Sequence, residues 1–309
     1  CSVTASIGFA GSLVFYNGFL PEVASQDKMD SVSAKGFAMG YIGSVILLII
    51  NLVLYQKYEV FGFENGSSAT RFGFIRVGVW WLGFAQIAFY YLKDINSRKK
   101  ITFKILGNGT KELKKVWEVV KDRSVMKRFL YSFFLFSMGV QTVMLLAPLF
   151  ADKEINMGAD EMIYIVLILQ ILAIGGAYFF AWLSKLRGNG FAISTTLLIW
   201  IFICISGYFT QDKISFYSLA AFLGFVMGGI QSISRSTYSK LIPVKAKDTA
   251  SYFSFYDITE KLAIVIGSLS YGFIDQVTGS MRYSMVFMSL FFIAGFVMLQ
   301  RANLKKNMV

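Results

Sequence analysis

Histidine is absent from this 309-residue sequence, and cysteine is nearly absent. Without histidine the chain has no histidine-based catalytic triad and no histidine-ligated metal site. Its two cysteines, Cys1 and Cys204, form neither a disulfide framework nor a zinc-binding spacing. We therefore expect no metal site and no cofactor, and any proton that the protein moves must be carried by a carboxylate.

Charged residues are also scarce, at 16% of the chain against about 25% in a typical soluble domain. Hydrophobic residues make up 56%, and apolar runs of about 20 residues recur along the sequence. This composition predicts an all-α polytopic membrane protein embedded in a lipid bilayer. No basic stretch carries an interleaved aromatic pattern, so we assign the net charge of +12 to cytoplasmic loops and expect no nucleic-acid partner.

Nine stretches of the sequence are long and apolar enough to cross a membrane. They cover residues 2–20, 35–56, 73–92, 128–150, 160–184, 190–209, 214–233, 252–274 and 283–300. Most lysines and arginines, including those of a basic linker at 93–127, fall on one side of this arrangement. The positive-inside rule therefore places the linker and the C-terminus in the cytoplasm.

The basic linker separates three predicted helices from six. We expect residues 1–92 to be the last three helices of an N-terminal bundle and residues 128–309 to be a complete six-helix C-terminal bundle. The chain begins with Cys1 instead of methionine and enters an apolar run at once. We therefore expect an N-terminally truncated piece of a protein with two six-helix halves.

Within the linker, residues 110–122 have the spacing of a short amphipathic helix. Leu113, Val116, Trp117 and Val120 share one face, and lysines occupy the other. Such a helix either lies on an anionic inner leaflet or packs as a solvated linker helix against the bundle. The sequence pattern leaves both alternatives open.

Charged groups gather on two neighbouring predicted helices. Gln231 and Arg235 lie one turn apart, while Asp257, Glu260 and Lys261 share one face of the next helix. A charge in the middle of a bilayer costs about 2.5–3.5 kcal/mol, so such groups pair with one another or line a watery path. We predict a gate in which Arg235 pairs with Asp257 or Glu260 and closes the cytoplasmic mouth.

Two other interpretations of this charged group stay open. In the first, the pair is static and only fixes the ends of the two helices. Alternatively, Asp257 or Glu260 is a carboxylate that couples transport to protons, with Lys261 beside it.

Amide side chains inside predicted membrane helices need polar partners there, and four of them are our candidates. They are Asn17, Gln141, Gln170 and Gln231. We treat them as candidates for lining a polar substrate cavity. The alternative is an ordinary hydrogen bond between helices, which is worth about 0.6 kcal/mol on average.

Five segments, spread over nearly the whole chain, carry a further signal. They are 15–24 (FYNGFLPEVA), 33–44 (SAKGFAMGYIGS), the pair Trp80 and Trp81, 229–236 (GIQSISRS) and 253–263 (FSFYDITEKLA). In this order they resemble the vacuole effluxer-like, autophagy-related permease-like family of the major facilitator superfamily. The resemblance implies a major-facilitator-type bundle with about nine of an expected twelve transmembrane helices, and secondary transport by alternating access.

For the solute, the resemblance implies a small polar molecule, since eukaryotic members of the family are associated with exporting amino acids from the vacuole. We expect a proton or sodium as the coupling ion and the inner membrane of a bacterium as the location. Two alternatives stay open: a non-transporting receptor or scaffold on a transporter fold, and a membrane-embedded enzyme. We expect no enzyme, because the sequence offers no catalytic cluster of nucleophile, base or metal ligands.

Overall fold

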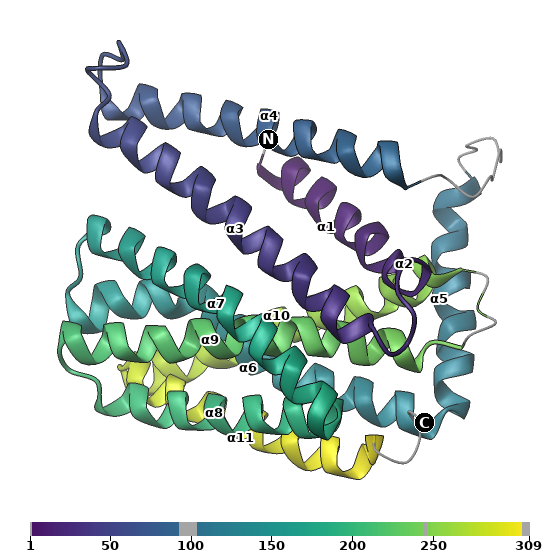
Figure 1. Ribbon diagram of the computed structural model, residues 1–309. Coiled ribbons are helices and arrows are strands. Elements are labelled where there is room, and N and C mark those ends of the chain that lie inside the picture. The colour runs from purple at the N-terminus through teal and green to yellow at the C-terminus, as the bar shows by residue number, and fades with distance from the viewer. Residues whose placement is uncertain (1, 93–103, 244–245, 247, 305–309) are drawn as a thin grey trace. The chain divides into compact units, whose positions relative to one another are not determined.

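The computed structural model describes residues 2–92, 104–243, 246 and 248–304 of the chain. Regular structure in these residues is helical throughout (Figure 1). The helices are α1 (Ser2–Gly18), α2 (Leu20–Val23), α3 (Met29–Gln56), α4 (Gly66–Tyr91), α5 (Lys104–Asp122), α6 (Ser124–Ile155), α7 (Ala159–Arg187), α8 (Asn189–Phe209), α9 (Lys213–Leu241), α10 (Thr249–Thr278) and α11 (Met281–Ala302).

In the described part of the chain, eight spans are long and apolar enough to cross a membrane. They comprise α1 with α2, then α3, α4, α6, α7, α8, α9 and α11. The remaining predicted span, residues 252–274, falls on α10. This helix has 30 residues but carries Asp257, Glu260 and Lys261 in adjacent turns. The protein is an all-α polytopic membrane protein, and α10 is long enough to cross a membrane but, with its charged residues, is not among the eight apolar spans.

The helices extend beyond the predicted spans at several ends. The largest extension toward the C-terminal side is in α9, where the prediction ends at residue 233 and the helix continues to Leu241. The extension keeps Arg235 and Lys240 on the same rigid helix as Gln231. These three side chains therefore hold a defined spacing along α9.

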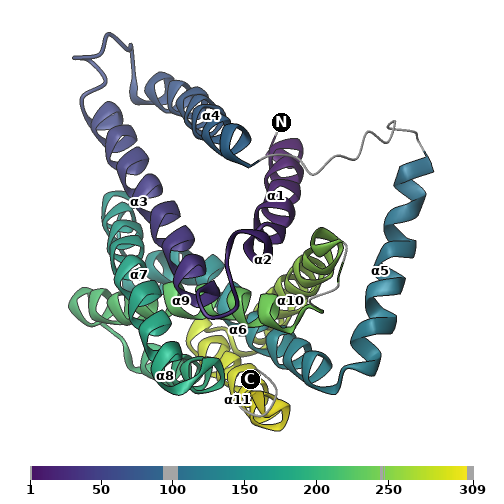
Figure 2. The same ribbon diagram turned by 45° about the vertical axis from the view of Figure 1, so that its right-hand side comes forward.

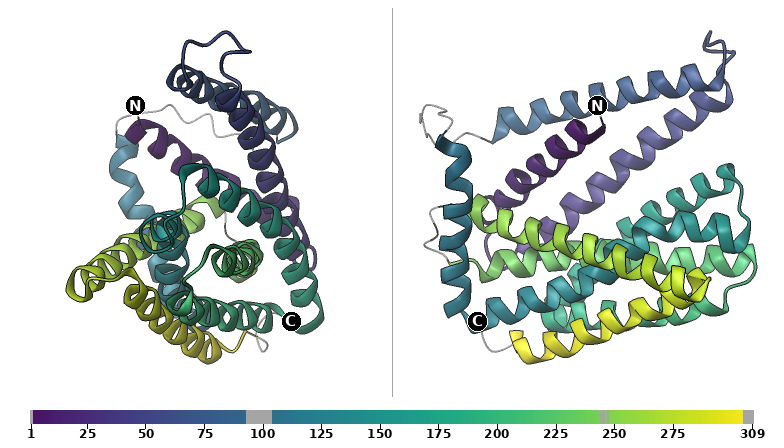
Figure 3. Two further views of the ribbon diagram at one scale, coloured as in Figure 1. Left: turned by 90° about the vertical axis from the view of Figure 1, so that its left-hand side faces the viewer. Right: turned by 180° about the vertical axis from the view of Figure 1, so that it is seen from behind.

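The amphipathic helix of the linker exists, and the structure shows which surface it covers. Residues 93–103 of the linker lie outside the described part of the chain, and α5 follows them. Val116 and Val120 are buried in the core, and the Trp117 ring stacks on Phe255 of α10 with 6.0 Å between ring centroids. The helix runs across the bundle helices and packs against them (Figures 1 and 3).

The chain forms two compact units, and the division falls within α3. One unit comprises residues 1–41 and 109–309, and the other comprises residues 42–108. The predicted boundaries at residues 92 and 128 refer to a longer arrangement with two six-helix halves. Those boundaries stay a prediction.

In the larger unit, α6 to α11 form a bundle in which α7 packs closely along α9 and α6 packs between α10 and α11. Helix α1 packs against α10, on the side of the bundle away from α8 and α11 (Figure 2). The α7–α9 contact depends on Gly228, because a Cβ atom there would overlap the backbone of Ala173. Small residues of this kind let two membrane helices approach at backbone distance.

Candidate functional site

Arg235 lies at the centre of a polar site in the larger unit. Its side chain is buried, at 4% exposure, and belongs to α9. Nε donates to Ser33 Oγ at 2.9 Å, and Nη2 donates to the Ser33 carbonyl at 2.8 Å. Nη1 donates to Asn17 Oδ1 at 3.2 Å. One guanidinium thus joins α9 to α3 and α1.

Aromatic rings complete the surroundings of the guanidinium. Its carbon lies 4.4 Å from the ring centroid of Phe37 and 5.1 Å from that of Tyr16. Both distances are within the range of a cation–π interaction. Gly36 allows this approach, because a Cβ atom there would overlap the Tyr16 hydroxyl and lie 3.1 Å from Arg235 Nη2.

The structure pairs the predicted gate residues differently from the sequence-based hypothesis. Among the described residues Arg235 forms no ion pair with Asp257 or Glu260. Asp257 instead lies 3.6 Å from Lys261, one turn along the same helix. Glu260 accepts a hydrogen bond from Gln141. An Arg235–carboxylate pair therefore stays a prediction about another conformation.

Two further contacts join polar side chains of α3 to polar side chains of α9. Together with the contact of Arg235 they form a row of polar pairs between the two helices. We name this row the polar ladder: Asp30 with Lys240 at 2.7 Å, Ser33 with Arg235 at 2.9 Å, and Tyr41 with Gln231 at 2.7 Å. The ladder extends over about 16 Å of α3, at 1.5 Å per residue. It links the two helices through side chains, unlike the backbone-close contact of α7 with α9.

At one end of the polar ladder, Asp30 is held by three partners. Its Oδ2 accepts from Lys240 Nζ at 2.7 Å and from Ser184 Oγ at 2.5 Å, and its Oδ1 accepts from Asn189 Nδ2 at 2.8 Å. Lys240 also donates to Asn189 Oδ1 at 3.0 Å. This buried cluster joins α3 to α7, α8 and α9.

Sequence reasoning missed the Asp30 cluster. The predicted span began at residue 35, so Asp30 seemed to belong to a loop, whereas α3 begins at Met29. A signal was present, because Arg235 and Lys240 place two cations on one helix without an acidic residue on it. The acidic partner comes from a helix 210 residues away.

At the other end of the ladder, Gln231 and Tyr41 meet α6. Gln231 Nε2 lies 3.7 Å from Met144 Sδ, in addition to the hydrogen bond that Tyr41 donates to Gln231 Oε1. Gln141 lies one turn before Met144 on α6 and donates to Glu260 Oε1 of α10 at 2.5 Å. The predicted residues Gln141, Gln231 and Glu260 are thus brought to neighbouring turns of adjoining helices.

Tyr256 of α10 packs among aromatic rings near Arg235 and Glu260. The Tyr256 ring stacks on Phe133 with 4.1 Å between centroids and lies 4.9 Å from Tyr238. Tyr256 is close enough to both Arg235 and Glu260 to be affected by their charges. Two groups of opposite charge thus lie near a buried tyrosine.

Gln170 is the predicted cavity residue that joins none of these contacts. Its Oε1 is buried on α7 and has no hydrogen-bond partner in the described part of the chain. A buried amide oxygen without a partner carries a free-energy cost of about 1–3 kcal/mol. A polar ligand or water would remove that cost.

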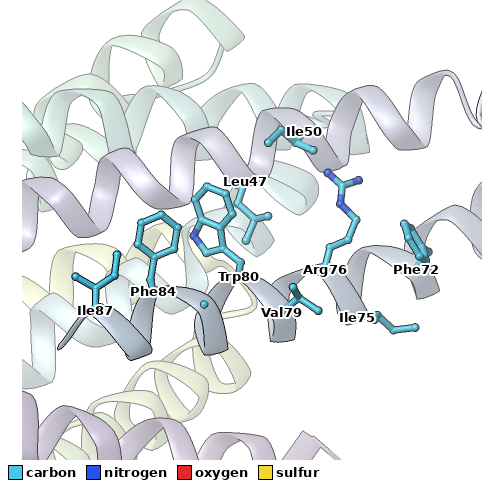
Figure 4. A pocket seen from close by; sticks show the side chains of 10 residues that line it. Leu47, Ile50, Phe72, Ile75, Arg76, Val79, Trp80, Phe84 and Ile87 are labelled. Carbon is cyan, nitrogen blue, oxygen red and sulfur yellow. The ribbon is translucent and has the colours of Figure 1, made fainter. Parts of the chain in front are cut away.

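The smaller unit contains a pocket of about 770 Å³ between α3 and α4. Apart from Arg76 and Gly83 its lining is aliphatic or aromatic, and the side chains of Arg76 and Trp80 point from α4 toward α3 (Figure 4). None of the predicted site residues lines it. Its apolar walls suit hydrocarbon contact better than a small polar solute.

The polar ladder can hold and release helices, and it contains no reaction centre. Its hydrogen bonds and cation–π contacts are reversible, and water can replace them when α3 moves away from α9. Ladder opening would separate α1 and α3 from α7 to α10. It would leave the interior contacts of α6 to α11 intact.

The whole chain, residues 1–309, matches the family model described as "Vacuole effluxer Atg22 like". The chain is 28% identical over 299 residues to the uncharacterized MFS-type transporter YxiO of Bacillus subtilis, a match that covers 96% of this chain and 68% of that protein. It is 27% identical to autophagy-related protein 22 of Eremothecium gossypii, covering 94% of this chain and 60% of that protein. It therefore spans about two thirds or less of the length of these relatives.

Among solved structures, the chain resembles the Escherichia coli fucose:proton symporter FucP with a TM-score of 0.65. The sequences are 14% identical, and the match covers 94% of this chain and 73% of that chain. A second structure of FucP, in the outward conformation, matches equally well. The likeness shows that the fold is that of the major facilitator superfamily.

Proposed function

Since this chain belongs to the family of Atg22-like vacuole effluxers, we propose that it forms most of a secondary active transporter for small polar solutes that works by alternating access. The observation that carries the proposal is the polar ladder between α3 and α9. A secondary transporter must hold its two halves together on one side of the membrane and release them by turns. Contacts in which polar side chains donate to side chains and to backbone carbonyls of the other helix suit that requirement.

The polar ladder is the gate on the cytoplasmic side. The predicted cytoplasmic segments are rich in lysine and arginine, and the Asp30 end of the ladder lies among them, next to Lys28 and Lys185. Closure buries the Asp30–Lys240 pair, whose side chains are 9% and 14% exposed. Opening would admit water to both charges, so neither is left buried without a partner.

The transported solute is an amino acid or a similar small zwitterion. Arg235 and Glu260 are groups of opposite charge near Tyr256, and a zwitterion would present one of its own charged groups to each. The family description as an effluxer supports the class of activity. Gln170 and Gln231 supply amide groups of the kind that orient a polar ligand.

The protein has two six-helix halves, of which residues 1–92 contribute three helices and residues 128–309 contribute six. The greater length of the matched relatives supports this arrangement. We place the transporter in the inner membrane of a bacterium, with a cytoplasmic C-terminus, and the similarity to a Bacillus subtilis protein supports this location. A proton or sodium drives the transport.

Counterflow in proteoliposomes tests the function. Vesicles loaded with one unlabelled amino acid should accumulate the same labelled amino acid when they contain the protein. The Arg235→Ala variant, which loses the central contact of the ladder, should exchange at least about tenfold more slowly, a loss equivalent to 1.4 kcal/mol. If the protein exchanges sugars or nucleosides but no amino acid, the solute class is wrong while transport stands. If it exchanges none of these solutes, the transport proposal is contradicted.

A further inference from the structure

We propose that Glu260 is the proton-binding group of this protein and that Gln141 is the amide that serves it in both protonation states. The inference rests on the proposed transport function and names the coupling ion and its carrier. The sequence offered two carboxylates for this role, Asp257 and Glu260. Their contacts now distinguish them.

The two carboxylates lie one turn apart on α10 but have different kinds of partner. Asp257 lies 3.6 Å from Lys261 Nζ, so a cation balances its charge. The hydrogen-bond partner of Glu260 is a neutral amide, with Gln141 Nε2 at 2.5 Å from Glu260 Oε1. Lys261 therefore pairs directly with Asp257, whereas Glu260 forms no ion pair among the described residues.

Few other charged groups on the helices around Glu260 could bind the proton in its place. On its own helix the groups that act on it are Asp257 and Lys261. Helix α1, which packs against α10, carries Tyr16 as its titratable group, and Arg235 of α9 is engaged by Ser33 and Asn17. The charged residues of α6 and α11, which also pack against α10, lie within two turns of the helix ends: Lys127, Arg128, Asp152, Lys153, Glu154, Arg282 and Arg301.

Gln141 is chemically suited to a carboxyl group that changes its protonation state. A carboxylate needs a donor, which the NH₂ group of an amide provides. A protonated carboxyl donates one hydrogen bond, and the amide oxygen accepts it after the side-chain amide turns over. The same residue can therefore satisfy both forms, which a lysine or an arginine could not do.

The membrane supplies the driving force for proton binding. A carboxylate within a transmembrane segment is costly, and the cost disappears when the group takes up a proton. The proton comes from water on one side of the membrane, forms the O–H bond of the carboxyl, and returns to water on the other side. Glu260 is partly exposed in this conformation, and the proposal requires water to reach it from each side of the membrane in turn.

Sodium fits this site less well than a proton. In transporters, sodium is coordinated by several oxygens, including backbone carbonyls freed where a helix is unwound. Helix α10 is continuous from Thr249 to Thr278, so its carbonyls are occupied around Glu260. The group that meets the carboxylate is also a nitrogen donor and not an oxygen ligand.

Labelling with dicyclohexylcarbodiimide tests the proposal without a known solute, because this reagent adds to protonated carboxyl groups in apolar surroundings. The purified full chain in liposomes is treated across a pH series in sodium and in potassium salts, and the modified residue is located by peptide mass spectrometry. We expect modification at Glu260 that decreases about tenfold per pH unit above its midpoint. It should be unaffected by the choice of sodium or potassium.

Variants give the matched controls. Glu260→Gln should lose the modification, while Asp257→Asn should keep it with the same pH dependence. Gln141→Leu should shift the midpoint, because it removes the partner of the charged form. Infrared difference spectra provide a second measurement: the C=O band of a protonated carboxyl should appear on acidification and be missing in Glu260→Gln.

Several outcomes overturn the inference. Modification of Asp257 in place of Glu260 would show that Asp257, and not Glu260, binds the proton. Protection by sodium at constant pH would make this a sodium site. A protein with neither modification nor an infrared band at any pH would have a permanently charged Glu260. Because none of these readouts uses a transported solute, failure of the counterflow assay leaves them interpretable.

Discussion

Lys240 of α9 and Asp30 of α3 meet with 2.7 Å between Nζ and Oδ2, although 210 residues separate them in the sequence. The pair brings a helix that precedes the basic linker against one that follows it. Ser184 also donates to Oδ2 and Asn189 donates to Oδ1, so the charge is buried without loss of hydrogen bonds. This cluster closes one end of the proposed gate.

Charge reversal should show whether the pair forms part of the working cycle. Asp30→Lys places two cations together in a buried site, and loss of one partner of such a pair costs about 3–5 kcal/mol. We expect counterflow to be abolished in Asp30→Lys and in Lys240→Asp, and to recover in part in the double variant. Asp27→Lys, at an exposed neighbouring position, is the matched control and should retain normal exchange. A double variant as inactive as the single ones would show that the pairing does not support transport.

Two glycines of α3 allow a test of the close approach around Arg235. A Cβ atom at Gly36 would overlap the Tyr16 hydroxyl, whereas nothing lies within 4 Å of one at Gly40. Gly36→Ala should therefore slow counterflow, with a penalty of about 1–3 kcal/mol for overpacking, and Gly40→Ala should not. Adding Tyr16→Phe removes the hydroxyl and should restore part of the rate. Equal effects of the two glycine substitutions would contradict this account.

The α7–α9 contact should behave as part of a rigid bundle and not as part of the gate. A Cβ atom at Gly228 would overlap the backbone of Ala173, which cannot rotate away as a side chain can. We expect Gly228→Ala to lower the melting temperature of the detergent-solubilised protein. Gly175→Ala, on the open side of α7, is the control and should leave it unchanged. If Gly228→Ala instead impairs transport at an unchanged melting temperature, then α7 and α9 move against each other during the cycle.

The start of α9 should respond to acid through Asp212. Hydrogen bonds from Ser215 to its carboxylate lower the pKa of Asp212 below its usual value. A lowered folded-state pKa means that this stabilisation is present above the unfolded pKa and is lost as the pH falls through the folded one. Asp212→Asn keeps a capping oxygen but does not titrate. The variant should therefore show a smaller acid-induced decrease in melting temperature than the wild-type protein, and identical acid profiles would exclude Asp212 as a contributor.

Much of the membrane architecture can be predicted from local sequence. Each apolar run becomes a helix because a bilayer provides no partner for backbone polar groups, so every span must satisfy its own. The amphipathic pattern of residues 110–122 likewise predicts a helix. It could not say whether Val116 and Val120 face lipid or protein, since both surfaces are apolar.

Some members of the polar site were among the predicted candidates, but its pairs were not. Asn17, Gln141, Gln231, Arg235 and Glu260 stand out because each is polar within an apolar run. Arg235 nevertheless meets Ser33 and Asn17 in place of a carboxylate, and Asp30 was assigned to a loop. A charged side chain has many possible partners along the sequence, and the sequence alone does not say which helices lie close enough to provide them.

The sequence by itself determined that this protein crosses a membrane as a set of helices, because hydropathy over about 20 residues is a local property. It also showed that the few polar side chains within the apolar runs need polar partners there. Only the tertiary structure decided which helices provide those partners. Asp30 and Lys240 become neighbours through the packing of α3 against α7, α8 and α9, and that packing depends on the shapes of all the helices together.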